Sequence, residues 1–95
     1  AIMIHSKEKT GKDIRQFCEK FRKKDIKTPI VVVPSTFNHI KEKEFEKMGV
    51  NIVIYANHML RSSYPAMLNV AKSILTNERS YDCNEKVVAL NVVVT

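Results

Sequence analysis

Three short apolar segments recur in the first 55 residues of the chain: Ala1–Ile4, Ile30–Val33 and Val50–Tyr55. They are rich in β-branched residues and do not alternate strictly between apolar and polar positions, which is typical of strands covered on both faces. Turn-forming residues, Pro34-Ser35-Thr36, follow the second segment. We therefore expect three strands of a parallel sheet.

The connections between these segments have the spacing of helices. The first connection carries apolar residues at the i, i+3, i+4 and i+7 positions of one helix face, namely Ile14, Phe17, Cys18 and Phe21. Thr10 and Asp13 resemble a capping box, so we expect them to close the start of this helix. The second connection is shorter, and its helix is expected to end at Gly49.

A longer apolar stripe follows the third predicted strand. Its members recur at helical spacing: Leu60, Tyr64, Met67, Leu68, Ala71, Ile74 and Leu75. Proline cannot donate a backbone hydrogen bond within a helix, so Pro65 is expected near a helix start or a break. The apolar segment Val87–Val94 is compatible with a terminal strand or with the start of a helix, and its pattern does not decide between them.

The predicted order is strand, helix, strand, helix, strand, helix with short connections, which is the pattern of right-handed βαβ units in an α/β fold. We divide the chain into three such units, 1–28, 29–49 and 50–76, and a C-terminal tail, 77–95, all within one partial domain. Three parallel strands leave two unpaired sheet edges and bury a modest core. The apolar start at Ala1 is interpreted as the middle of a strand, and we expect either further chain before it or association between copies.

Functional groups are expected at the carboxyl ends of these strands, because in a barrel those ends converge on one mouth. Three pairs follow the predicted strands there: His5 and Ser6, Ser35 and Thr36, and Asn57 and His58. Considered from the residues alone, ligand binding competes with a structural role for His5, with the start of a turn for Ser6, and with helix capping for Asn57.

Charge and cysteine content exclude several classes of protein. The net charge is +6, and nine basic residues against four acidic ones fall within residues 7–27. Acidic residues are interspersed and no aromatic residues alternate with the basic ones, so a solvated helix face explains this patch better than a nucleic-acid surface. No apolar run approaches the roughly 20 residues needed to cross a bilayer. Cys18 and Cys83 lie outside any CxxC spacing, which argues against a thiolate metal site and favours a reducing, cytoplasmic location.

Several strings of residues have a distinctive order and spacing. They are Ile4-His5-Ser6-Lys7, Val31-Val32-Val33-Pro34, Gly49-Val50, Val53-Ile54-Tyr55-Ala56-Asn57-His58 and Leu60-Arg61-Ser62-Ser63. In this order they resemble the sixth to eighth strands of the phosphoenolpyruvate mutases, which belong to the isocitrate lyase superfamily. The resemblance covers almost the whole chain and is loosest after about Ser80. It implies the last three βα units of a (β/α)8 barrel of the TIM type.

The resemblance implies a reversible isomerisation of phosphoenolpyruvate to phosphonopyruvate, with Mg²⁺ as cofactor, which begins phosphonate biosynthesis. It implies that His5 is catalytic and contacts the phosphoryl group. A transferring phosphoryl group needs fixed hydrogen-bond donors and positive charge, which an imidazole can supply. From their place at the strand ends, Ser6 and Asn57 are further candidates for substrate binding. His58 and Arg61 are candidates for a supporting structural role, and Arg61 could either reach an anion or pair with a carboxylate.

The Mg²⁺ ligands are not expected in this chain. Mg²⁺ prefers several oxygen ligands in octahedral arrangement, whereas the acidic residues lie on predicted helices: Asp13, Glu19, Glu42, Glu44 and Glu46. We therefore expect no metal site and no turnover by the chain alone. Ser35-Thr36 also departs from the Thr-Lys pair of several mutases, so the family's lysine is absent at this point.

Two alternative functions are retained. A phosphonopyruvate hydrolase or another lyase of the same superfamily would share these strands, because the loop that separates the reactions lies outside the resemblance. A small basic module that binds nucleic acid or an acidic partner is the alternative of another class.

In this superfamily the helix after the last strand often packs against a neighbouring subunit. The resemblance therefore also implies a homo-oligomer formed through Leu60–Leu75.

Overall fold

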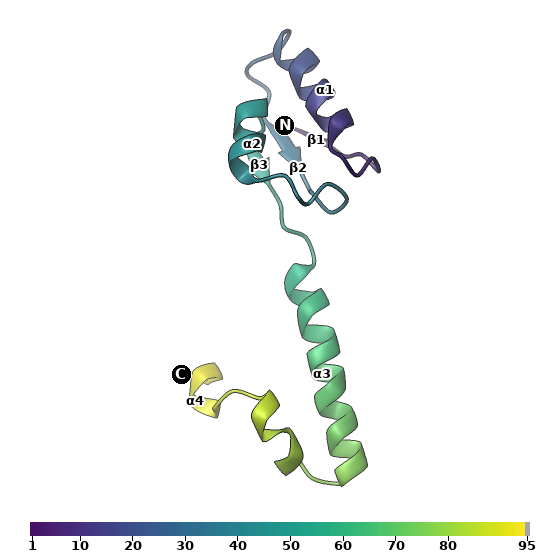
Figure 1. The fold of residues 1–95 in the computed structure, drawn as a ribbon. Coiled ribbons are helices and arrows are strands. Elements are labelled where there is room, and N and C mark those ends of the chain that lie inside the picture. Colours follow the sequence, from purple (N-terminus) through teal and green to yellow (C-terminus); the bar gives the residue numbers. More distant parts are fainter. Residues whose placement is uncertain (95) are drawn as a thin grey trace. The chain divides into compact units, whose positions relative to one another are not determined.

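The computed structural model describes residues 1–94 of the chain, which divides into two compact units. The first unit runs from Ala1 to Ala56 and contains a small sheet with two helices (Figure 1). Its elements are β1 (Ile2–Ile4), α1 (Lys12–Arg22), β2 (Ile30–Val32), α2 (Glu42–Met48) and β3 (Ile52–Val53). The second unit begins at Asn57 and contains α3 (His58–Asn77), a short 3₁₀ helix η1 (Tyr81–Lys86), and α4 (Leu90–Val93).

The three strands form one parallel sheet in the order β1, β2, β3. Ile4 of β1 lies beside Val32 of β2, and Val32 lies beside Val53 of β3. The predicted α/β fold, with three parallel strands that alternate with helices, is therefore confirmed. The third strand begins later than predicted, because the Val50 N–H donates to the Phe45 carbonyl at 3.0 Å and closes the end of α2.

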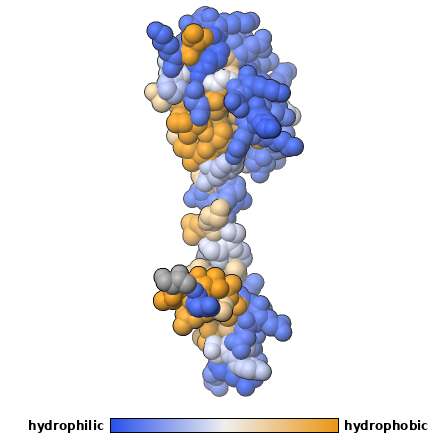
Figure 2. Space-filling view, turned by 90° about the vertical axis from the view of Figure 1, so that its left-hand side faces the viewer, coloured by the Kyte–Doolittle hydropathy of each residue, from blue (hydrophilic) through white to orange (hydrophobic). Residues whose placement is uncertain are grey.

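Helices α1 and α2 supply the apolar residues that cover one face of the sheet. The core consists of Ile14, Cys18, Ile30, Val32, Phe37, Ile40, Phe45 and Val50. On the opposite face, Met3, Val31 and Ile52 lie side by side in register. This face is open at its two outer strands, because Met3 is 64% exposed and Ile52 is 48% exposed, whereas Val31 between them is buried. Figure 2 shows that each unit presents apolar surface.

The start of α1 differs from the prediction. Gly11 occupies the N-cap position of α1 with a left-handed φ of 80°. Glycine has no side chain, so the N-cap residue itself makes no capping hydrogen bond. Thr10 donates its hydroxyl to Glu8, and the Glu8 carboxylate also accepts from the Lys12 N–H at 2.9 Å. The Thr10 hydroxyl accepts from the same Lys12 N–H at 3.3 Å, so Thr10 does bond the helix start. Asp13 does not complete the predicted capping box, because its carboxylate accepts from the Ser6 hydroxyl instead.

Gly49 ends α2 in a left-handed conformation with φ of 89°, which confirms the predicted stop. Arg22, the last residue of α1, lies directly against it, and its Nε and Nη2 donate to the Gly49 carbonyl at 3.0 and 2.6 Å. A Cβ atom at position 49 would lie 2.7 Å from Arg22 Nε. Glycine therefore provides both the backbone angle and the space for the guanidinium.

Helix α3 confirms the predicted helical stripe, but it contains no buried residue. Pro65 lies inside this helix, so its predicted place near a start or break is wrong. Proline has no backbone N–H, so the Arg61 carbonyl lacks its helical partner at position 65. Arg61 and Pro65 are both exposed, so water can hydrate that carbonyl. Within the apolar segment Val87–Val94, only Leu90–Val93 is helical and forms α4. Among residues 1–94, no helix is both long and apolar enough to span a membrane.

Candidate functional site

The carboxyl ends of β1 and β2 lie side by side, and both continue into loops that carry predicted site residues. His5 and Ser6 directly follow β1, and Ser35 and Thr36 follow β2 after Pro34. Thr36 Oγ1 donates to the Ser6 carbonyl oxygen at 3.0 Å. The structure therefore brings two of the three predicted pairs together at one edge of the sheet.

The His5 side chain is exposed at this edge. Its ring centroid lies 6.2 Å from that of Phe37, with an angle of 42° between the ring planes. Phe37 is fully buried and packs edge-on against Phe45 of α2. The imidazole is thus held on one side by the core and accessible on another, and such a group can donate a hydrogen bond to an anion.

The hydroxyl of Ser6 is engaged by residues of its own loop and of α1. It donates to Asp13 Oδ2 at 2.9 Å and accepts from the Glu8 N–H at 3.1 Å. A hydrogen bond from this hydroxyl to a substrate would have to replace the one to Asp13. The geometry therefore favours the turn for Ser6, and its role in substrate binding stays a prediction.

Asn57, His58 and Arg61 belong to the second unit, so a common site with His5 stays a prediction. Asn57 is the N-cap residue of α3 with a left-handed φ of 65°, but its side chain forms no capping hydrogen bond. Its carbonyl accepts from the Arg61 N–H at 2.8 Å. His58 is half-buried. Arg61 is exposed and takes part in none of the ion pairs found within residues 1–94.

The end of β3 is anchored by a contact that the sequence did not reveal. The phenol of Tyr55 donates to the carboxylate of Glu42 in the first turn of α2. This hydrogen bond raises the pKa of Tyr55 above its ordinary value. An exposed tyrosine after a strand has many potential partners, so the sequence offered no signal that selects Glu42.

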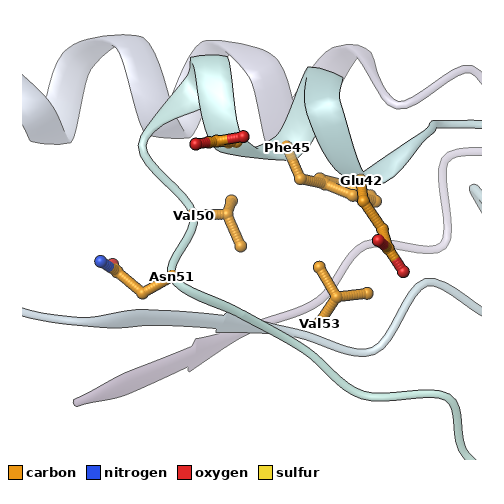
Figure 3. Close-up of a pocket in the computed structure, with 6 residues that line it drawn as sticks. Glu42, Phe45, Val50, Asn51 and Val53 are labelled. Carbon is orange, nitrogen blue, oxygen red and sulfur yellow. The ribbon is translucent and has the colours of Figure 1, made fainter.

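A groove of about 490 Å³ lies between α2 and the segment that leads into β3 (Figure 3). Its lining consists of Glu42, Phe45, Glu46, Val50, Asn51 and Val53. Val50 and Val53 point into this space. None of the predicted site residues lines it, and the carboxylates of Glu42 and Glu46 would repel a phosphoryl anion. The groove is therefore not the candidate substrate site.

The described part of the chain does not fit a magnesium site. Within residues 1–94, no three side chains of histidine, cysteine, aspartate or glutamate come together in a way that could hold a metal ion. The acidic residues considered above lie on α1 and α2: Asp13, Glu19, Glu42, Glu44 and Glu46. Two of their carboxylates reach strand ends singly, Asp13 at Ser6 and Glu42 at Tyr55.

Sequence comparison connects the chain to one group of enzymes. A family model described as "Phosphoenolpyruvate phosphomutase" matches residues 1–75. A phosphoenolpyruvate phosphomutase of Tetrahymena pyriformis is 31% identical over 93 residues, which are 98% of this chain and 30% of that protein. A phosphonopyruvate hydrolase of Variovorax sp. (strain Pal2) is 35% identical over 71 residues, which are 74% of this chain and 23% of that protein.

Structure comparison leads to the same group. The crystal structure of a phosphoenolpyruvate phosphomutase from Streptomyces platensis subsp. rosaceus matches with a TM-score of 0.84 at 29% identity, over 98% of this chain and 31% of that chain. A phosphonopyruvate hydrolase in complex with oxalate and Mg²⁺ matches with a TM-score of 0.81 at 26% identity, over 98% of this chain and 32% of that chain. The chain thus spans about 30% of the length of the relatives that it matches.

Proposed function

This chain belongs to the phosphoenolpyruvate phosphomutase family of the isocitrate lyase superfamily, and on that basis we propose that it supplies strands six to eight of a (β/α)8 barrel. The structural match to a mutase covers 31% of the length of that mutase chain, which supports this proposal. The row of Met3, Val31 and Ile52 supports it too, because this sheet face, open at Met3 and Ile52, would form the packed interior of such a barrel. In this proposal 1–28, 29–49 and 50–76 are successive βα units, and 77–95 is the tail.

For the complete enzyme we propose the interconversion of phosphoenolpyruvate and phosphonopyruvate, which forms a carbon–phosphorus bond for phosphonate biosynthesis. The bond between phosphorus and the enol oxygen breaks and a bond between phosphorus and carbon forms, so no atom is gained or lost. The observation that carries this proposal is the exposed imidazole of His5 at the carboxyl end of β1, held on one side by Phe37.

His5 is the proposed catalytic residue of the chain. A ring N–H of His5 would donate to a peripheral oxygen of the phosphoryl group and stabilise its negative charge during transfer. Ser6 and Asn57 are proposed to bind substrate, although the hydroxyl of Ser6 must first leave Asp13. His58 and Arg61 are proposed to support the structure around the site.

Mg²⁺ is proposed as the cofactor of the complete enzyme, because a related hydrolase structure contains it. A bound Mg²⁺ would neutralise charge on the substrate. Since residues 1–94 do not form a site for it, its ligands are proposed to come from the part of the barrel that this chain does not supply. The chain alone is therefore expected to be inactive.

The test is to give phosphonopyruvate and Mg²⁺ to the full-length protein and to follow the products by phosphorus NMR. We expect phosphoenolpyruvate from the full-length protein and no product from residues 1–95 alone. Pyruvate with free phosphate would instead establish the hydrolase, the second candidate, which the 35% identity to the Variovorax hydrolase favours. A folded full-length protein that forms neither product would contradict the proposed function.

We propose that the enzyme is a homo-oligomer in which α3 packs against another subunit. An apolar helical stripe is normally buried, yet α3 contains no buried residue. Its exposed apolar side chains include Leu60, Tyr64, Met67 and Leu75. A stable monomer of the full-length protein in a sedimentation experiment would exclude this arrangement.

A cytoplasmic location is proposed because both cysteines, Cys18 and Cys83, are free thiols, which a reducing compartment preserves. The proposed partner is the small-molecule substrate. Nucleic acid is not a proposed partner, and salt-dependent retention of the chain on DNA or RNA would contradict that view.

A further inference from the structure

Thr36 joins the two loops at the carboxyl edge of the sheet. Its Oγ1 donates to the Ser6 carbonyl oxygen at 3.0 Å, and the two residues are 30 positions apart in the sequence. Because Ile4 of β1 lies beside Val32 of β2, the two loops leave the sheet next to each other. Thr36 is half-buried, so water competes for this bond less than it would at a fully exposed site.

The residue after Thr36 contacts the other member of the strand-end pair. Phe37 lies against the imidazole of His5, with ring centroids 6.2 Å apart. Phe37 cannot shift freely, because it is fully buried and packs against Phe45. Two successive residues of the β2–α2 loop therefore hold His5 and Ser6, one through a ring contact and one through a hydrogen bond.

The remaining bonds of Ser6 come from the other side. Its hydroxyl donates to Asp13 and accepts from the Glu8 N–H, and both partners lie on the β1–α1 side. Among the described residues, Thr36 is the only side chain of the β2–α2 loop that hydrogen-bonds to the His5–Ser6 pair. The orientation of the Ser6 carbonyl, and with it the backbone next to His5, therefore depends on Thr36.

We infer that Thr36 is a positioning residue that fixes His5 at the carboxyl end of β1. The effect of Thr36 on catalysis rests on the proposed function. The positioning of His5 by Thr36 rests on the hydrogen bond to Ser6 and on the contact between the His5 and Phe37 rings. A shift of about 1 Å in a group that acts on a transition state can lower the rate by as much as 100-fold. Substrate binding by the rest of the barrel would be affected less.

The test compares Thr36→Val, which keeps the shape of the side chain but removes the donor, with Thr36→Ser, which restores the donor. In the full-length enzyme, we expect Thr36→Val to lower kcat for phosphonopyruvate about tenfold, with KM changed by less than about twofold. Thr36→Ser should recover kcat to within about twofold of the wild type. Asn38→Ala, at an exposed position of the same loop, is the control and should change neither constant. A Thr36→Val enzyme with wild-type kcat, or a Thr36→Ser enzyme equally impaired, would overturn the inference.

A second measurement does not depend on turnover. The NMR signals of the His5 ring protons, assigned with His5→Ala in the full-length enzyme, report the contact with the Phe37 ring. We expect Thr36→Val to move these signals toward those of free histidine and Thr36→Ser to leave them in place. Unchanged signals in Thr36→Val would refute the positioning role. If the wild-type enzyme does not convert phosphonopyruvate, the proposed function fails, and the NMR comparison still decides whether Thr36 positions His5.

Discussion

Replacement of Arg22 by alanine should destabilise the first unit by about 2–4 kcal/mol. The guanidinium donates twice to the Gly49 carbonyl, through Nε at 3.0 Å and Nη2 at 2.6 Å. Its Nη1 donates to the carbonyls of Asp25 at 3.0 Å and Thr28 at 2.8 Å, and Nη2 also donates to Asn51 Oδ1 at 2.9 Å. One side chain therefore joins the end of α1 to the segments that precede β2 and β3.

The expected loss is smaller than the number of bonds suggests. A hydrogen bond that involves a charged group contributes about 1.5–3 kcal/mol, but the contributions within one network do not add. Arg22 is half-buried, so water can reach part of the acceptors in the variant. The expected loss of stability in Arg22→Ala therefore corresponds to about one to two full hydrogen bonds, chiefly those to the Gly49 carbonyl. Arg22→Lys should recover less than half of the loss, because an ammonium lacks the planar fork of donors.

Urea unfolding followed by circular dichroism gives the total stability of the chain. Hydrogen exchange of the β2 amides reports the first unit, and a loss of 2–4 kcal/mol corresponds to a decrease in protection of about 30- to 1,000-fold. Arg15→Ala is the matched control, because Arg15 has one 3.4 Å contact with Glu44 and both side chains are 48% exposed. Its expected cost is below about 1 kcal/mol. Equal losses for the two alanine variants would show that the Arg22 hydrogen bonds do not stabilise the first unit.

Two further predictions concern titratable groups. Hydrogen bonds from the Thr28 hydroxyl and N–H and from the Lys27 N–H hold the pKa of Asp25 below its ordinary value. Asp25 therefore stabilises the folded chain above its unfolded pKa of about 3.9. This stabilisation should be lost as the pH falls through the lower pKa of the folded state. An Asp25→Asn variant with the same acid unfolding profile as the wild type would contradict this. Burial raises the pKa of the Cys18 thiol, so in a Cys83→Ser background Cys18 should react with a thiol reagent at pH 8 far more slowly than free cysteine, and reaction at the free rate would contradict its burial.

The strands and helices could be predicted because their signals are local. Ile30 and Val32 of the β-branched run enter the core, as do Ile14 and Cys18 at their helical spacing. Gly49 was recognisable for the same reason, since a left-handed residue at a helix end is usually glycine.

The contacts that shape the candidate site could not be predicted. Thr36 and Ser6 are 30 positions apart, and Tyr55 and Glu42 are 13 apart. Nothing in the residue pattern selects these pairs from the other exposed polar side chains. The start of α1 was predicted only in part for a related reason: the Thr10 hydroxyl bonds both the Lys12 N–H and the Glu8 carboxylate, and the sequence does not show that Glu8 takes the place expected for Asp13.

The imidazole of His5 at the end of β1 is proposed to act on the phosphoryl group, and this proposal supports every functional step above. It is tested most directly by the rate at which the full-length His5→Ala enzyme converts phosphonopyruvate, measured by phosphorus NMR beside the wild type and the Lys9→Ala control. We expect a decrease of at least about 100-fold for His5→Ala, with native circular dichroism, and little change for Lys9→Ala. A His5→Ala enzyme that keeps its rate within about twofold of the wild type would contradict it.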